Sequence, residues 1–244
     1  MLKIKKYIPN TITSMNLACG VLGVVVCTVF HRMDLAFYLM LAGACCDFCD
    51  GLSARALGAY SPMGKELDSL ADLISFGLLP SVMLFITLYM NAGTDSCLVF
   101  VPLLIAVFSG LRLAKFNVDE RQSCSFIGLA TPACAMICGS LAYYMQACPD
   151  EAFAQACSNI WVIPCISVVL SLLLVSEIPM FSMKIHKGEG MTKDMVLRII
   201  FAAAVVVCAL AVGISGHNWS LIVLCAFIAY ILINIISAIF VRRK

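Results

Sequence analysis

The chain has 244 residues, of which 62% are hydrophobic and only 12% are charged, and its formal net charge is +2. A soluble domain carries about 25% charged residues, so this composition excludes an ordinary soluble globular protein. Apolar runs near 20 residues long recur along the sequence, and such a run can cross a hydrocarbon core of about 30 Å. We therefore predict an all-α, polytopic membrane protein that forms a single domain, 1–244.

The apolar runs predict a bundle of about eight transmembrane helices. They are expected at 12–30, 35–57, 68–91, 97–114, 128–147, 159–177, 197–214 and 219–240. With the N-terminus in the cytoplasm, Arg32 alone among the 16 Lys and Arg residues falls on the outer side. Because basic residues gather in cytoplasmic loops, both termini are predicted to be cytoplasmic. The run after basic Met1–Lys6 lacks a small-residue cleavage site, so we expect a first span rather than a signal peptide.

The 14 cysteines lie mostly in apolar runs, where a free thiol behaves as a small hydrophobic group. Cys46 and Cys49 form a C-x-x-C pattern, but no second Cys or His pair lies nearby, which disfavours zinc or redox chemistry. Cys148 and Cys157 share a predicted outer loop, and the sequence leaves open whether they pair.

Four aspartates stand where the second predicted span ends and the third begins. Asp47 and Asp50 are three residues apart, and Asp68 and Asp72 are four apart, so each pair lies on one helix face. One aspartate at the centre of a membrane helix costs about 2.5–3.5 kcal/mol. Four such anions repel one another, and we expect cations to neutralise them.

The turn between these two spans sets the depth of the acids. Gly58 is typical of a helix end, and Ser61 followed by Pro62 is typical of a helix start. At 1.5 Å per residue, Asp47 and Asp72 then lie roughly 15 Å from the turn on antiparallel helices. We therefore predict that the four carboxylates converge on one pocket at the cytoplasmic side.

An all-oxygen site without histidine or thiolate favours Mg²⁺ or Mn²⁺, and four carboxylates could hold two ions. Two other interpretations remain open: interfacial acids paired with Lys65 and Arg55, or a cation channel or transporter. Gly51 and Ala54 leave room for a phosphate or nucleotide beside the helix. Arg55 could bind an anionic oxygen there, or simply extend to the membrane interface.

These residues resemble the signature of the CDP-alcohol phosphatidyltransferase superfamily, D-x-x-D-G-x-x-A-R-x8-G-x3-D-x3-D. All eight fixed positions are present: Asp47, Asp50, Gly51, Ala54, Arg55, Gly64, Asp68 and Asp72. The resemblance implies that the four aspartates hold a binuclear metal site and that Asp72 also acts as the base. It further implies a set of residues that bind the CDP-diacylglycerol donor: Asn10, Thr13, Asn16, Gly51, Ala54, Arg55, Ser61 and Gly64.

Further stretches are similar to the phosphatidylserine synthase branch of this superfamily. They are 75–81, 112–117, 126–133 and 173–184, so the similar core covers about 8–184, and two further spans, about 197–240, match only in hydropathy. Lys115, Ala130 and Glu177 depart from that branch, which often has Arg, Pro and Asn there. The resemblance implies L-serine as the acceptor, with Arg112, Lys115 and Asn117 as tentative binding residues.

A serine carboxylate needs a cation, which Arg112 or Lys115 could supply, although both could instead anchor their span at the interface. The implied activity transfers the phosphatidyl group of CDP-diacylglycerol to the serine hydroxyl and releases CMP. The implied enzyme is a homodimer in the bilayer of the cell membrane, with its active site facing the cytoplasm and no nucleic-acid partner. Glycerol 3-phosphate or inositol phosphate as acceptor, and a Mg²⁺- or proton-coupled transporter, remain alternatives.

Overall fold

A computed structural model of the protein describes residues 2–92, 96–118, 126–180 and 193–242, and these are almost entirely helical. The long helices are α1 (Leu2–Val29), α2 (Met33–Leu57), α3 (Pro62–Asp72), α4 (Leu79–Ala92), α5 (Leu104–Val118), α6 (Thr131–Ala147), α8 (Val162–Val175), α9 (Lys193–Ser215) and α10 (Ser220–Arg242). A π-helical turn, Leu73–Leu78, joins α3 to α4, and a 3-10 turn, Cys97–Leu103, precedes α5. The prediction of an all-α fold is confirmed.

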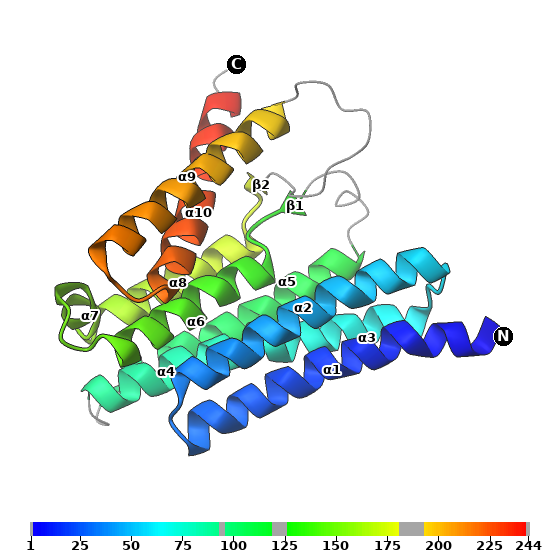
Figure 1. Ribbon diagram of the computed structural model, residues 1–244, viewed down its shortest axis with the longest axis horizontal. Helices are drawn as coiled ribbons and strands as arrows, with labels where there is room; N and C mark the ends of the chain where they lie inside the picture. Colours follow the sequence, from blue (N-terminus) through cyan, green and yellow to red (C-terminus); the bar gives the residue numbers. More distant parts are fainter. Residues whose placement is uncertain (1, 93–95, 119–125, 181–192, 243–244) are drawn as a thin grey trace.

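The helices fall into two groups (Figure 1). α1 to α6 and α8 run side by side and form the main body, whereas α9 and α10 form a hairpin that rises from it at a steep angle. Within the body α1 packs along α2 and α3, and α5 packs against α8. The hairpin is attached chiefly through α10, which packs against α6.

Within the described residues, six helices are long and apolar enough to cross a membrane: Tyr7–Val29, Met33–Leu57, Pro62–Asn91, Cys97–Val118, Met195–Ser215 and Ser220–Ile239. They correspond to six of the eight predicted spans. α6, with 17 residues, and α8, with 14, match the other two but are shorter. The count of eight and the cytoplasmic termini therefore stay predictions. Several basic residues used for that topology, namely Arg121, Lys184, Lys187, Arg243 and Lys244, lie outside the described residues.

The turn between α2 and α3 has the predicted caps. Gly58 ends α2 with a positive φ of 58°, and its N–H donates to the carbonyl oxygens of Ala54 and Arg55. The Ser61 hydroxyl accepts a 3.0 Å hydrogen bond from the backbone N–H of Gly64, and Pro62 is the first helical residue. The third helix thus begins at Pro62, as the cap predicted, six residues before the membrane span expected from 68.

The first span lies unusually close to the π-helical turn. A β-carbon on Gly20 would lie 2.4 Å from the Ser75 hydroxyl and 2.9 Å from its α-carbon. The Ser75 hydroxyl donates a 2.9 Å hydrogen bond to the backbone oxygen of Asn16. Only a glycine leaves space for this approach, which fixes α1 against the segment that follows Asp72.

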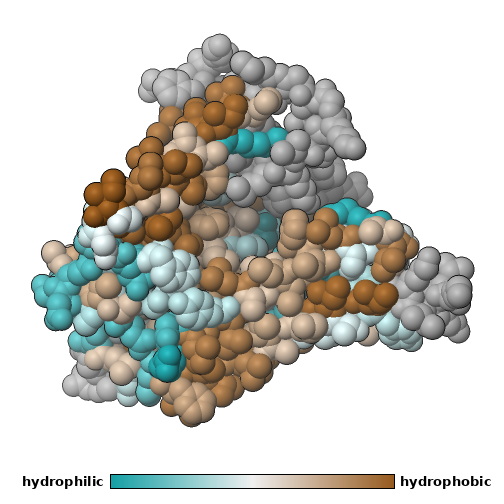
Figure 2. Space-filling view, viewed as in Figure 1, coloured by the Kyte–Doolittle hydropathy of each residue, from teal (hydrophilic) through white to brown (hydrophobic). Residues whose placement is uncertain are grey.

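α6 lies at the centre of the body, with 14 of its 17 residues buried. By contrast, many large apolar side chains of α9 are exposed, including Val206, Val207, Leu210 and Ile214. Figure 2 shows this hydrophobic surface running along the raised hairpin. An apolar surface of this extent suits contact with lipid tails.

The segments after α5 and α8 meet as a small antiparallel pair of strands, β1 (Phe126–Ile127) and β2 (Pro179–Met180). Just before the short helix α7 (Ala152–Cys157), the Glu151 carboxylate accepts hydrogen bonds from the Tyr144 hydroxyl and, at 2.7 Å, from His217 Nδ1. This contact joins the start of α7 to the connection between α9 and α10. Cys148 and Cys157 are both free thiols.

Candidate metal and phosphate-transfer site

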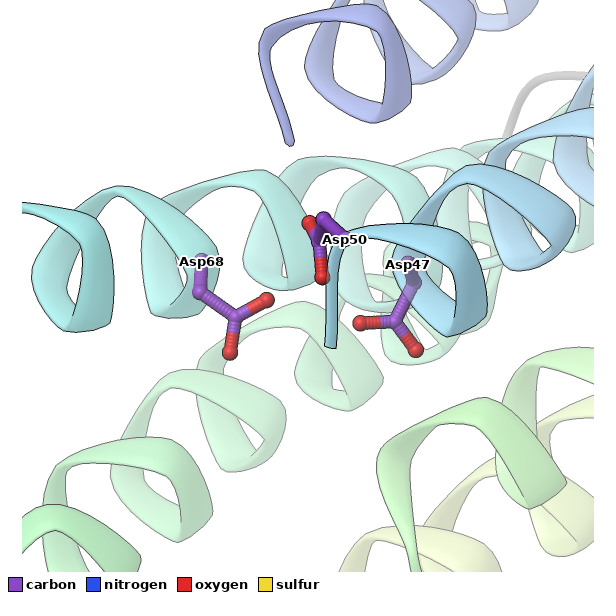
Figure 3. Close-up of side chains that lie close together, drawn as sticks. All are labelled: Asp47, Asp50 and Asp68. Carbon is purple, nitrogen blue, oxygen red and sulfur yellow. The ribbon is translucent and has the colours of Figure 1, made fainter. Parts of the chain in front are cut away.

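Three of the four predicted aspartates come together at the interface of α2 and α3. Asp47 and Asp50 extend from α2 and Asp68 from α3, and their carboxylates face one another (Figure 3). One oxygen from each lies within 4.8 Å of the others. Asp50 is buried and the other two are half-buried. This arrangement of three convergent carboxylates on a rigid helix pair suits a divalent cation.

Asp72 lies beside this group but is not part of it. Its carboxylate is close enough to those of Asp47 and Asp68 for the like charges to repel. Asp72 Oδ1 lies 3.4 Å from the amide nitrogen of Asn16 on α1, which donates to it. Its assignment as a fourth metal ligand and as the base thus stays a prediction.

A hydrogen bond from α1 holds the Asp50 carboxylate, whereas the Asp68 carboxylate has an oxygen without a hydrogen-bond partner among the described residues. The Thr13 hydroxyl lies 2.6 Å from Asp50 Oδ2, to which it donates, and both residues are buried. Within the described chain, Asp68 Oδ1 is buried and has no hydrogen-bond partner. A buried carboxylate oxygen without a partner is costly, and a hard cation held by Asp47, Asp50 and Asp68 would satisfy it. The residues present therefore fit a divalent metal.

A pocket of about 220 Å³ opens beside the acids, between the N-terminal half of α1 and the α2–α3 turn. Its walls include seven of the eight residues predicted to bind the donor: Asn10, Thr13, Gly51, Ala54, Arg55, Ser61 and Gly64. Asn16, the eighth, is fully buried and lies against Asp72 instead. Asp50 and Asp68 also line the pocket, so the acid cluster forms part of its wall.

Two small residues give this pocket its shape. A β-carbon on Gly64 would lie 2.9 Å from Asn10 Oδ1, so a larger residue would push into the wall. At Gly51 the β-carbon position is 3.8 Å from the Arg55 guanidinium, which is exposed at the rim. The alternative of interfacial acids would pair Lys65 with one of the aspartates. Lys65 Nζ instead donates to the backbone oxygen of Asn117 at 3.2 Å. Arg55 lines the pocket and is exposed, so it can bind an anion there.

Arg112, predicted to bind the acceptor, is buried in α5. Although charged, it is only 8% exposed, and it is close enough to Asp72 for their charges to attract. Its Nη1 donates a 3.0 Å hydrogen bond to the Thr131 hydroxyl, and its guanidinium carbon lies 5.5 Å from the centre of the Phe116 ring. Its buried Nε has no partner among the described residues. An anchored arginine with an unused donor is suited to bind an anion.

The other two acceptor residues are placed differently. Lys115 is exposed and lies 3.8 Å from the Glu177 carboxylate, which is also exposed. The Asn117 side chain donates a 2.9 Å hydrogen bond to the Ser69 hydroxyl. Both therefore contact neighbouring segments, and Asn117 does so beside Asp68, through Ser69.

The sequence reasoning missed two polar residues around Arg112. Thr131 is the first residue of α6, and Tyr230 lies in α10, close enough to Arg112 for an electrostatic interaction. The sequence held a signal for Tyr230 but none for Thr131: Tyr230 and Asn234 are polar residues one helical turn apart within an apolar span, where such residues tend to be functional.

Comparison with known proteins agrees with this geometry. A protein-family model for CDP-alcohol phosphatidyltransferase matches residues 6–186. A *Bacillus subtilis* CDP-diacylglycerol–serine O-phosphatidyltransferase is 33% identical over 190 residues, which cover 76% of this chain and 96% of the relative. A *Mycobacterium leprae* protein of the same name is 31% identical over 233 residues, or 92% of this chain and 73% of the relative.

A *Saccharomyces cerevisiae* protein of that name is 35% identical over 156 residues, 57% of this chain and 55% of the relative. The family model ends before α9, so α9 and α10 lie outside the shared core. Within that core the acid cluster, the pocket and Arg112 are all found. The resemblance noted in the sequence is confirmed: the chain belongs to the CDP-alcohol phosphatidyltransferase family, whose members are phosphotransferases dependent on a divalent metal.

Proposed function

We propose that the protein transfers the phosphatidyl group of CDP-diacylglycerol to the hydroxyl of L-serine, giving phosphatidylserine and CMP. The observation that carries the proposal is the cluster of convergent carboxylates beside a pocket lined by residues predicted to bind the donor. The relatives that share most of this chain carry the name of that activity.

Asp47, Asp50 and Asp68 would hold Mg²⁺ or Mn²⁺, and with Asp72 the site offers ligands for two ions. When bound, the metal neutralises the diphosphate of the donor and stabilises the charge that develops on the leaving phosphate. The unsatisfied Asp68 oxygen supports this assignment. An oxygen-only ligand set favours these ions over zinc.

Three side chains have separate roles around the reacting phosphorus. Asp72 accepts the proton of the serine hydroxyl, and the serine oxygen forms a bond to the lipid-side phosphorus. The bond from that phosphorus to the oxygen of CMP breaks, and CMP leaves. Arg55 at the pocket rim binds the leaving phosphate. Asn16 orients the Asp72 carboxylate through its 3.4 Å contact.

Arg112 binds the serine carboxylate in this proposal. Its burial makes the interaction with an anion stronger than it would be in water. Lys115 and Asn117, also predicted for serine, contact Glu177 and Ser69, and their part in serine binding stays a prediction. Ordinary neutral alcohols offer no charge for Arg112 to bind.

We also propose that the site faces the cytoplasm of the cell membrane and that the enzyme is a homodimer. The cytoplasmic side is supported by the basic residues that follow α5 and surround the α2–α3 turn. On that side a soluble acceptor such as serine reaches the pocket without crossing the membrane.

The direct test is a CMP-release assay on purified protein with CDP-diacylglycerol, in which the acceptor and the metal are varied. Serine, glycerol 3-phosphate and inositol phosphate are compared with Mg²⁺ and with Mn²⁺, and the lipid product is identified by thin-layer chromatography. We expect phosphatidylserine and metal-dependent CMP release. CMP release with glycerol 3-phosphate or inositol phosphate but not with serine would show that serine is not the acceptor. Cation flux in liposomes without CMP release would instead support a transporter.

A further inference from the structure

The Asn16 side chain of α1 lies against two other segments of the chain. It is fully buried, and its amide nitrogen Nδ2 lies 3.4 Å from Asp72 Oδ1, at the end of α3. Its oxygen Oδ1 lies on the side of Gly43 in α2. The backbone oxygen of Asn16 also accepts a 2.9 Å hydrogen bond from the Ser75 hydroxyl, in the π-helical turn. Asn16 therefore connects α1 to α2 and to the segment around Asp72.

The position of Asn16 depends on the absence of a side chain at Gly43, which is itself buried. A β-carbon on Gly43 would lie only 2.9 Å from Asn16 Oδ1. Its next neighbours would be the β-carbons of Cys19 and Ser75, both 3.7 Å away and thus in ordinary van der Waals contact. A methyl group here would therefore meet one atom too closely, and that atom belongs to the amide that contacts Asp72.

The Asn16 oxygen gains nothing polar from its burial against α2. Oδ1 is buried and has no hydrogen-bond partner within the ranges that the structure describes. A buried acceptor without a partner lowers stability, whereas an apolar side chain of similar size would avoid this cost. Packing against α2 therefore does not explain an asparagine at this position. Its polar contact is on the Nδ2 side, with Asp72.

We propose that Gly43 is a positioning residue of the transfer reaction, because it leaves the space in which the Asn16 amide is held against Asp72. This role rests on the proposed function, in which Asp72 is the base. The amide donates to Asp72 Oδ1 and leaves the other carboxylate oxygen to accept the serine proton. A contact of 3.4 Å is long, and such contacts often shorten when substrate is bound. Gly43 lies outside the signature, which begins at Asp47.

The test is Gly43→Ala, with CMP release measured while serine and CDP-diacylglycerol are varied in turn. The methyl group should displace the Asn16 amide, and a small displacement at a reaction centre slows the reaction by up to about 100-fold. We expect kcat to fall about 10- to 100-fold and both KM values to stay as in the unaltered protein, since Asp72 acts in the chemical step. Binding of Mn²⁺, followed by electron paramagnetic resonance, should also stay unchanged.

Asn16→Ala separates this role from a general disturbance of the helices. It should lower kcat about as much as Gly43→Ala does. Adding Gly43→Ala to it should have no further effect, because the atom that the methyl group would meet is gone. Gly23→Ala is the matched control on α1, since its β-carbon would lie 2.6 Å from Leu79 Cδ2, and it should leave kcat unchanged.

Normal kcat in Gly43→Ala or in Asn16→Ala would overturn the role of Gly43, and so would an equal loss from Gly43→Ala in both backgrounds. Weaker Mn²⁺ binding by Gly43→Ala would also overturn it, because the effect would then lie at the metal ligands. If Gly43→Ala does not fold, recovery of folding in the double variant supports the contact, and no recovery contradicts it. In all these cases the proposed function stands. If the unaltered protein releases no CMP with any acceptor, the proposed function is wrong as well.

Discussion

The amide nitrogen of Asn16 in α1 lies 3.4 Å from Asp72 Oδ1, in the helix that ends at the π-helical turn. The same stretch of α1 contributes Thr13, whose hydroxyl donates to Asp50. The first helix therefore orients acids from both helices of the signature. It does so from a position fixed by the close contact of Gly20 with Ser75.

Asp72→Asn should abolish turnover and preserve folding. The amide cannot accept the serine proton, so we expect kcat to fall by about 10²- to 10⁴-fold, while Asn16 can still contact the side chain. CMP release measures the activity, and thermal unfolding measures the fold. Asp34→Asn, which alters the exposed pair with Arg32, is the control and should retain activity. Near-normal turnover of the Asp72 variant would exclude it as the base.

Metal removal should stop the reaction reversibly. Chelation by EDTA is expected to abolish CMP release, and Mg²⁺ or Mn²⁺ should restore it. Asp68→Asn removes one of the three convergent carboxylates, so half-maximal activity should require at least about tenfold more metal. Binding of Mn²⁺, followed by electron paramagnetic resonance, gives a readout independent of turnover. Unaltered Mn²⁺ binding by this variant would contradict its role as a ligand.

The turn between α2 and α3 was predictable because its determinants are local. Gly58, Ser61 and Pro62 each fix a backbone group next to them, and the structure has the expected caps. The acids at fixed spacing on the flanking helices then had to share one interface. Seven of the eight residues predicted to bind the donor line one pocket, and their role stays a prediction; Asn16 lies outside it because its position depends on how α1 rotates against the other helices.

Arg112 was singled out from the sequence, but its surroundings could not be predicted in the same way. Arg112, Thr131 and Tyr230 come from three helices that are far apart in the sequence, and no local pattern connects them. The π-helical turn after Asp72 adds a residue to one helical turn, so a regular 3.6-residue period places the following side chains incorrectly. Both features arise from tertiary packing.

Arg112→Lys should weaken serine binding selectively. Lysine keeps the charge but loses the two-donor edge, so the serine KM should rise about 10- to 100-fold. The KM for CDP-diacylglycerol should stay unchanged, because Arg112 does not line the pocket proposed for the donor. Steady-state CMP release with each substrate varied measures both. Arg32→Lys, the same change at an exposed pair, should affect neither, and an unchanged serine KM in Arg112→Lys would remove Arg112 from the acceptor site.

Gly20→Ala should destabilise the fold. The added methyl group would lie 2.4 Å from the Ser75 hydroxyl and 2.9 Å from its α-carbon, so α1 must move away from the π-helical turn. Overpacking of this kind costs about 1–3 kcal/mol, measurable as a lower unfolding temperature in detergent. Gly213→Ala is the control, because no heavy atom lies within 4 Å of its β-carbon position. Equal stability of the two variants would show that α1 adjusts freely.

Glu151→Gln should reduce the dependence of stability on acid pH. Hydrogen bonds from Tyr144 and then from His217 hold the pKa of the Glu151 carboxyl below its usual value of 4.5. A lowered pKa in the folded protein stabilises it above that usual value, and this contribution is lost as the pH falls through the folded-state pKa. The unfolding temperature, measured between pH 7 and about pH 3, should therefore fall less steeply in Glu151→Gln. Asp150→Asn removes an exposed carboxylate from the same loop and should keep the steeper fall. Identical slopes for Glu151→Gln and the unaltered protein would show that the contact with His217 does not stabilise the α9–α10 connection.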